Sequence, residues 1–133
     1  MNGFLLDTNV ISEQARKAPD PAVITWMSGL AGFAVSVITV EEIAFGLSIK
    51  PNARIARWVD RLFQNVNVLD ISMRIARRSG ELRARARLTG STRSLADMLI
   101  AATTIDHDLV LATRNARDFE GLGVRLFNPW IER

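Results

Sequence analysis

Short apolar runs alternate with segments of helical character along the whole chain, and this alternation constrains the fold more than any other feature. The runs typical of short β-strands are residues 3–6, 32–37, 66–71, 109–113 and 124–127. Strands that alternate with helices form a parallel sheet covered on both faces. We therefore predict a single α/β domain over residues 1–133, with a central parallel β-sheet flanked by helices on both faces.

The intervening helices are predicted from capping residues and from the period of their apolar side chains. Asp20 followed by a proline is typical of a helix start. Further helices are expected to begin at about Asn9, Thr39, Ser72 and Ser94. The helix from Ser72 has a predicted inner stripe of Ile75, Ser79, Leu82 and Ala86. The clearest helical period runs through Ile55, Trp58, Val59, Leu62, Phe63 and Val66, so these aromatic rings are interpreted as core or interface rather than base-stacking platforms.

The composition excludes several classes of protein. A hydrophobic fraction of 48% fits a compact domain and argues against disorder. No apolar run approaches the ~18 residues of a membrane span, and Asp7 interrupts the first apolar residues, so we expect neither membrane association nor a secretory signal. Without cysteine there is no disulfide, thiolate metal site or cysteine nucleophile. A cytoplasmic location is the simplest expectation.

Arginine dominates the basic residues, because only Lys17 and Lys50 are lysines among the 17 basic side chains. Arginine presents a planar fork suited to bidentate phosphate contacts. One segment, with Glu81 as its only acid, carries Arg74, Arg77, Arg78, Arg83, Arg85, Arg87 and Arg93. This pattern leaves open a solvated helix face, bridges to a protein partner, or a surface that follows nucleic-acid phosphates.

Polar and acidic side chains follow two of the predicted strands directly. Asp7 follows the first strand, while Thr113, Asn115 and Asp118 follow the strand "LVLA". In parallel sheets of this kind, ligands bind beyond the carboxyl ends of the strands. These side chains are therefore expected at the edge of the sheet where a ligand would bind.

Two more acids belong to helix starts that should lie at the same edge. Glu42 is predicted in the first turn of the helix that follows the second strand, and Asp97 in the first turn of the Ser94 helix. Right-handed connections between parallel strands place such helix starts where the strands end. Asp7, Glu42, Asp97 and the residues at 115–118 can therefore converge.

Each acid also has a purely structural interpretation. Thr39 to Glu42 has the spacing of a capping box, Ser94 to Asp97 resembles one, and Asp7 suits a turn. As a group the acids are harder to explain in this way. Two carboxylates ~4 Å apart repel by roughly 4 kcal/mol at an effective dielectric near 20, whereas a helix dipole returns only ~0.3–1 kcal/mol. A cluster of acids must therefore hold a cation or take up protons.

The available ligands favour a hard divalent ion. His107, the single histidine, is expected in a solvated turn at the opposite edge of the sheet. Oxygen-only ligands select Mg²⁺ or Mn²⁺ over zinc. Such an ion can activate a water and neutralise charge on a phosphate undergoing in-line displacement. We therefore interpret Asp7 as a metal ligand.

Five segments together carry a family resemblance: "LLDTNVISE", "SVITVEEIAFG", "LADMLIAATT", "LATRNARDF" and "FNPW". In this order they resemble the PIN-domain ribonucleases, most closely those of the VapC/FitB type, the toxins of toxin–antitoxin pairs. The resemblance implies a homodimer, Mg²⁺-dependent cleavage of RNA that leaves 5′-phosphate and 3′-hydroxyl ends, and a small antitoxin that blocks the site. It carries the catalytic carboxylates onto Asp7, Glu42 and Asp97, whereas Glu41 points about 100° away from Glu42 on the helix.

One position departs from the family pattern. Asn115 stands where many relatives have Asp, so it can offer an oxygen to Mg²⁺ but no charge. Asp118 is the candidate for the missing carboxylate, or it fixes the local turn. The expected catalytic set is Asp7, Glu42, Asp97, Asp118 and Asn115, with the four acids as metal ligands. Asn9 and Thr113 are expected to hold those ligands in place.

Other functions fit the sequence less well. An aspartyl phosphatase would carry a second Asp two residues after the first, where this chain has Asn9. A receiver domain would need a lysine after a late strand, and neither Lys17 nor Lys50 is placed there. A degenerate PIN module that binds RNA or a protein without cutting remains an alternative, favoured only by Asn115.

Overall fold

The computed structural model describes residues 3–132, and these residues form five strands, six α-helices and one short 3₁₀ helix. The strands are β1 (Phe4–Leu6), β2 (Ala34–Ser36), β3 (Asn67–Leu69), β4 (Val110–Ala112) and β5 (Arg125–Phe127). The helices are α1 (Thr8–Glu13), α2 (Pro21–Ser28), α3 (Val37–Ile49), α4 (Ala53–Asn65), α5 (Met73–Leu88) and α6 (Leu95–Asp106), with the 3₁₀ helix η1 at Ala116–Phe119. None of these helices is both long and apolar enough to span a bilayer.

All five strands belong to one parallel sheet of order β3-β2-β1-β4-β5. The chain adds β2 and β3 on one side of β1 and then β4 and β5 on the other. The order of the strands therefore reverses at β1, which is the position where ligands bind in open parallel sheets. Asp7 follows β1 immediately.

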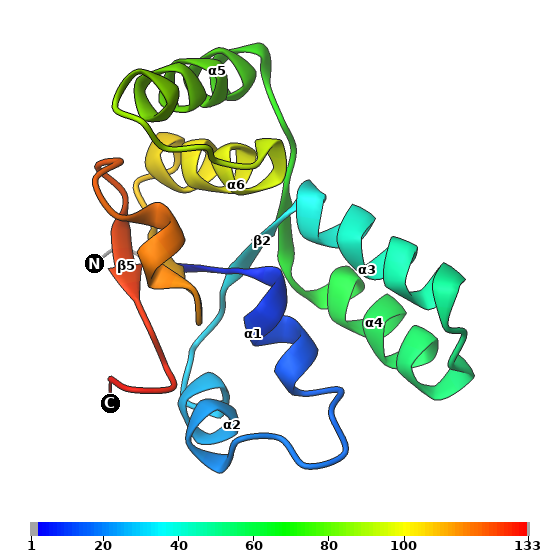
Figure 1. The fold of residues 1–133 in the computed structure, drawn as a ribbon. Coiled ribbons are helices and arrows are strands. Elements are labelled where there is room, and N and C mark those ends of the chain that lie inside the picture. The colour runs from blue at the N-terminus through cyan, green and yellow to red at the C-terminus, as the bar shows by residue number, and fades with distance from the viewer. Residues whose placement is uncertain (1–2, 133) are drawn as a thin grey trace.

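Neighbouring residues of each strand point to opposite faces of the sheet, and each face is covered by different helices. Figure 1 shows α5 and α6 on one side of the sheet and α1 and α2 on the other. Leu5 belongs to the buried cluster on the α5–α6 side, whereas Leu6 belongs to the cluster on the α1–α2 side. This confirms the predicted parallel sheet with helices on both faces.

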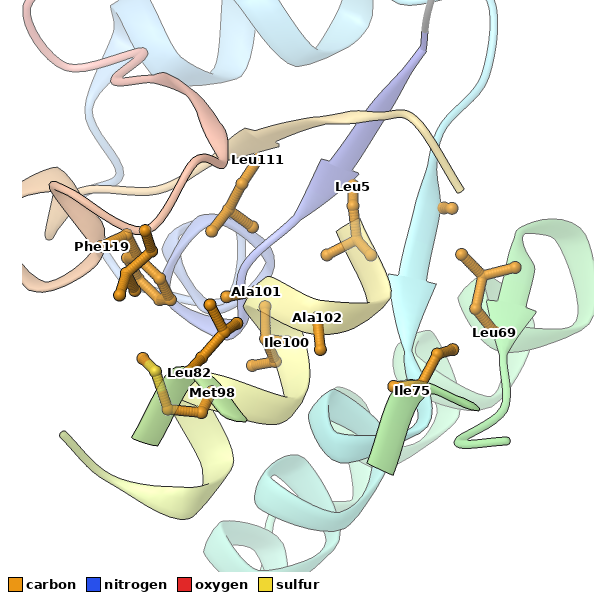
Figure 2. Packing of buried hydrophobic residues seen from close by; sticks show 12 residues of the cluster. Leu5, Leu69, Ile75, Leu82, Met98, Ile100, Ala101, Ala102, Leu111 and Phe119 are labelled. Carbon is orange, nitrogen blue, oxygen red and sulfur yellow. The ribbon is translucent and has the colours of Figure 1, made fainter. Parts of the chain in front are cut away.

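The α5–α6 side holds the larger of the two clusters. Figure 2 shows Leu5 and Leu111 of the sheet above Ile100, Ala101 and Ala102 of α6, with Leu82 and Phe119 nearby. The predicted inner stripe of α5 is buried throughout. The small side chains of α6 allow this helix to lie close to the strands, which fixes the position of its first turn.

The stripe predicted for α4 is less deeply buried than that of α5. Only Val59 is fully buried, while Trp58, Leu62, Phe63 and Val66 are half-buried against the cluster on the α1–α2 side. This agrees with the interpretation of the aromatic rings as packing residues.

The predicted start of the third helix is wrong. The N-cap of α3 is Ser36, whose Oγ accepts a hydrogen bond from the Ile38 backbone N–H at 3.0 Å. Thr39 lies inside the helix, where its buried hydroxyl is 2.9 Å from that of Thr8. Strand β2 therefore runs directly into α3, and Glu42 belongs to the second turn of the helix rather than to a capping box.

Candidate active site at the carboxyl edge of the sheet

Asp7 is the centre of the candidate site, and backbone geometry brings it there. It follows β1 and is the N-cap of α1, with its Oδ1 accepting from the Thr8 backbone N–H at 2.8 Å. Its Oδ2 accepts from the Thr113 hydroxyl at 2.8 Å and from the Asn9 side-chain amide at 3.3 Å. The side chain is buried, and these three hydrogen bonds fix its orientation.

Burial changes the acidity of Asp7. Loss of solvent raises the pKa of this carboxyl from 3.8 to about 6, although the hydrogen bonds from Thr113 and Thr8 act in the opposite direction. The negative charges of Asp97 and Glu42 make smaller contributions to the same rise in pKa. These two acids are therefore close enough to Asp7 to interact with it electrostatically.

Asp97 approaches from α6. Its backbone N–H donates to Oγ of Ser94 at 3.1 Å, so the predicted helix start is confirmed. Burial raises the pKa of the Asp97 carboxyl, the Ser94 hydrogen bond lowers it, and the charges of Asp118 and Glu42 raise it again. Asp97 thus interacts with acids of α3 and η1 as well as with Asp7.

Glu42 is linked to α1 through hydroxyl groups. The Thr8 hydroxyl donates to Oε1 of Glu42 at 2.6 Å and lies 2.9 Å from the Thr39 hydroxyl. Because Thr8 has a single hydroxyl proton, Thr39 must be the donor in the second contact. Thr8 is not among the residues predicted for the site, although its position directly after Asp7 in "LLDTN" could have suggested it.

Thr113 and Asn9 occupy the supporting positions expected of them. Besides donating to Asp7, the Thr113 hydroxyl accepts from the Asn115 backbone N–H at 3.0 Å and from the Asn9 amide at 3.4 Å. Asn9 also accepts from the Arg114 backbone N–H at 3.2 Å. The end of β4 is therefore fastened to the start of α1 around the Asp7 carboxylate.

Asn115 and Asp118 lie at the periphery of the site. Asn115 precedes η1 and caps it without a side-chain hydrogen bond, and its side chain is exposed. Asp118 is also exposed, and its backbone carbonyl accepts a hydrogen bond from the Arg93 guanidinium. Asp118 is connected with the other acids through its negative charge, which raises the pKa of Asp97.

The acids lie near one another but do not form a preformed metal-binding site in the described part of the chain. Within residues 3–132, no three carboxylate or imidazole side chains lie close enough together, in the rotamers of this structure, to hold one metal ion. A shared ion would need bridging waters or a rotation of Glu42 away from Thr8. The donors available are all oxygens, as Mg²⁺ and Mn²⁺ prefer.

Comparison with known proteins establishes the family. The family model of the PIN domain matches residues 4–123, which include every strand except the last. The chain belongs to the PIN-domain family. The match includes Asp7, Glu42 and Asp97, so the carboxyl edge described above lies within the PIN domain.

Several relatives resemble this PIN domain over nearly its full length. It is 36% identical to the VapC ribonuclease Y4jK of Sinorhizobium fredii, over 96% of this chain and 97% of the relative. It is 34% identical to the toxin FitB of Neisseria gonorrhoeae, over 96% of this chain and 98% of that protein.

Solved structures of this type have the same fold. A crystal structure of FitAcB from Neisseria gonorrhoeae matches with a TM-score of 0.85 and 33% identity, covering 97% of this chain and 99% of that one. A toxin–antitoxin complex from Klebsiella pneumoniae matches with a TM-score of 0.73 and 29% identity, covering 96% and 98%. The fold class and the family predicted from the sequence are therefore confirmed.

The arginine-rich segment of this PIN domain lies mostly on the outer face of α5. Arg93 is half-buried and contacts the backbone near η1, whereas the other arginines of the segment are exposed. Arg74, although exposed, forms an ion pair with Asp106 at 2.9 Å. A pocket of about 590 Å³ is lined partly by Arg83, Arg87 and Arg93. His107 is exposed at the C-terminal end of α6, away from the start of the helix that carries Asp97.

Proposed function

We propose that this PIN domain is a metal-dependent endoribonuclease and the toxin of a toxin–antitoxin pair. The observation that carries the proposal is the meeting of Asp7, Glu42 and Asp97, from three separate elements, at the edge where β1 ends. The charges of Glu42 and Asp97 raise the pKa of Asp7 at this edge, which is unfavourable unless a cation or a proton compensates.

A divalent ion would fit this group of acids. Asp7 and Asp97 are the proposed main ligands of Mg²⁺, for which Mn²⁺ could substitute. Glu42 and Asp118 would bind through water or after a side-chain rotation, and Asn115 would offer a neutral oxygen. When bound, the ion would supply an activated water and neutralise charge on the phosphodiester.

The chain's own residues would orient the reacting groups. Thr113, Thr8 and Asn9 hold the Asp7 carboxylate in one rotamer, so its oxygens are preorganised. The Thr8 hydroxyl donates to Glu42 and keeps that carboxylate beside the start of α1.

The relatives support the choice of substrate and partner. The Sinorhizobium fredii relative is named as a ribonuclease, and the Klebsiella pneumoniae structure is a toxin–antitoxin complex. We infer that the substrate is RNA, that a cognate small antitoxin blocks the carboxyl edge, and that two copies of the chain form a homodimer. The alternative, a module that binds without cutting, has the support of Asn115 alone.

Cleavage of RNA by the purified protein tests the proposal. We expect wild-type protein to cut total RNA in Mg²⁺ and not in EDTA, because the acids need the ion. Asp97→Asn should lower the cleavage rate by at least about a hundredfold, since it removes a proposed ligand. Asp60→Asn makes the same change on the exposed face of α4 and should leave the rate unchanged. Unaltered RNA binding without cutting under any divalent ion would instead identify the non-cleaving module.

A further inference from the structure

A polar pocket adjoins the candidate site, and none of the chemistry above makes use of it. Its volume is about 360 Å³, and its lining residues are Asn9, Ser12, Glu13, Arg16, Arg114 and Trp130. Asn9 connects it with the site, because the Asn9 amide also contacts the Asp7 carboxylate at 3.3 Å. A molecule bound at the carboxylates could therefore extend directly into this pocket.

An arginine that lies over an indole ring lines one part of the pocket. The Cζ of Arg114 lies 5.2 Å from the centre of the Trp130 ring. Trp130 is half-buried against the cluster on the α1–α2 side, whereas Arg114 is exposed. Within residues 3–132, Arg114 forms no ion pair with a carboxylate. This part of the lining thus offers a supported, positively charged plane to a ligand.

Backbone hydrogen bonds fix the position of this part of the lining relative to Asp7. The Arg114 N–H donates to Oδ1 of Asn9 at 3.2 Å, and the Arg114 carbonyl accepts from the Asn128 amide at 3.2 Å. Oδ1 of Asn128 in turn accepts from the Trp130 backbone N–H at 2.9 Å. The segment "FNPW" is therefore joined to α1 through the loop after β4. These hydrogen bonds hold the lining residues of the pocket in place.

The lining of the pocket includes a second cation. Arg16 forms an ion pair with Glu13 at 3.2 Å, yet 58% of its side chain is exposed. Glu13 is buried, and its Oε2 also accepts from the Asp20 backbone N–H at 2.7 Å. The charged residues that line the pocket are therefore one acid, Glu13, and two arginines, Arg16 and Arg114, so the lining has a net positive charge.

We propose that this pocket binds one nucleotide of the RNA next to the cleaved bond. This inference rests on the proposed ribonuclease function. A base would stack on the Arg114 guanidinium, which Trp130 supports, and the neighbouring phosphate would lie between Arg114 and Arg16. Unpaired bases stack on aromatic rings and on arginine planes in this way, and the same cations attract the backbone. An acidic peptide would use the positive charges of the pocket but not the guanidinium plane of Arg114, so the pocket fits a nucleotide better than a peptide.

RNA binding in the absence of turnover tests the pocket directly. A fluorescent single-stranded RNA oligonucleotide would be titrated with protein in EDTA, and the Kd read from fluorescence anisotropy. We expect Arg114→Gln to weaken binding about tenfold, because it removes both the charge and the plane. Arg114→Lys should recover only part of the loss, since lysine keeps the charge alone. The matched control is Arg57→Gln, on the exposed face of α4, with a change below about twofold.

Cleavage by the active protein provides a second readout. Arg114→Gln should raise KM and leave kcat nearly unchanged, because Arg114 is linked to Asp7 only through its backbone N–H and the side chain of Asn9. Sequencing of the cut ends should show a weaker nucleotide preference at one position beside the cleaved bond. Trp130→Phe, which keeps an aromatic ring in the core, should produce a smaller change of the same kind.

The outcomes separate this proposal from the one it rests on. Equal RNA affinity of Arg114→Gln and Arg57→Gln would overturn the nucleotide pocket while leaving the nuclease proposal intact. If Arg114→Gln weakened the binding of an acidic peptide and left RNA affinity unchanged, the pocket would be a peptide site and the nucleotide proposal would be overturned. Failure of the nuclease proposal would appear differently, as wild-type protein that does not cut in any divalent ion.

Discussion

Asp7 combines a structural and a functional role in one side chain. It caps α1 through the Thr8 N–H and at the same time presents a carboxylate whose pKa is raised mainly by burial. The capping interpretation and the metal-ligand interpretation of this acid are therefore compatible. What distinguishes them is the response of the protein to pH and to divalent ions.

The raised pKa of Asp7 predicts how stability depends on pH in EDTA. The folded protein holds the Asp7 proton up to a pKa of about 6, while the unfolded chain releases it near 3.8. Between these values the unfolded state binds fewer protons, so this group's contribution to the free energy of unfolding falls as pH rises. The loss amounts to about 3 kcal/mol, is complete above about pH 7, and is absent below about pH 3.

Urea unfolding of wild type and Asp7→Asn at several pH values would measure this contribution. The difference in unfolding free energy between the two proteins should change by about 3 kcal/mol from pH 3 to pH 7, because only wild type titrates at this position. Mg²⁺ should restore stability to wild type at pH 7. A difference that is constant across this range would contradict the raised pKa.

At the scale of elements, local patterns predicted the helices and strands well. Asp20, Ser72 and Ser94 cap α2, α5 and α6 as expected, because each combines a capping side chain with a clear change of pattern. The start of α3 was misplaced since Ser36 and Thr39 are both suitable caps. In the structure Ser36 is the cap, and the Thr39 hydroxyl instead contacts Thr8, a long-range contact that no local pattern contains.

Ser79 in α5 carries a buried hydroxyl without a hydrogen-bond partner among residues 3–132, which the periodic pattern of α5 could not reveal. The residue itself is buried as predicted. We expect Ser79→Ala to raise the free energy of unfolding by about 1 kcal/mol, because it removes an unsatisfied buried group and favours the helix. Thermal and urea unfolding would measure the change.

The control for Ser79 is a serine of α3 that does have a partner. The exposed Ser48 hydroxyl donates to the Ala44 carbonyl at 2.8 Å, so Ser48→Ala should gain helix propensity alone. A Ser79→Ala protein no more stable than Ser48→Ala would show that the Ser79 hydroxyl is satisfied in solution.

At the scale of the whole molecule, topology brought the acids together. The right-handed connections of a parallel sheet were enough to predict that Asp7, Glu42 and Asp97 share an edge. Their separation could not be predicted, because it depends on rotamers and on hydroxyl bridges such as that of Thr8. The pocket beside Trp130 was also beyond sequence reasoning, since it joins residues from both ends of the chain.

We infer that Asp7 and Asp97 share a divalent ion. The most direct measurement is anomalous diffraction from crystals of this protein grown with Mn²⁺. We predict one strong peak at the carboxyl edge of the sheet, within ~2.0–2.4 Å of a carboxylate oxygen of each residue or one water away from it. Full occupancy of Mn²⁺ elsewhere with none at this edge, in protein that still cuts RNA, would contradict the account.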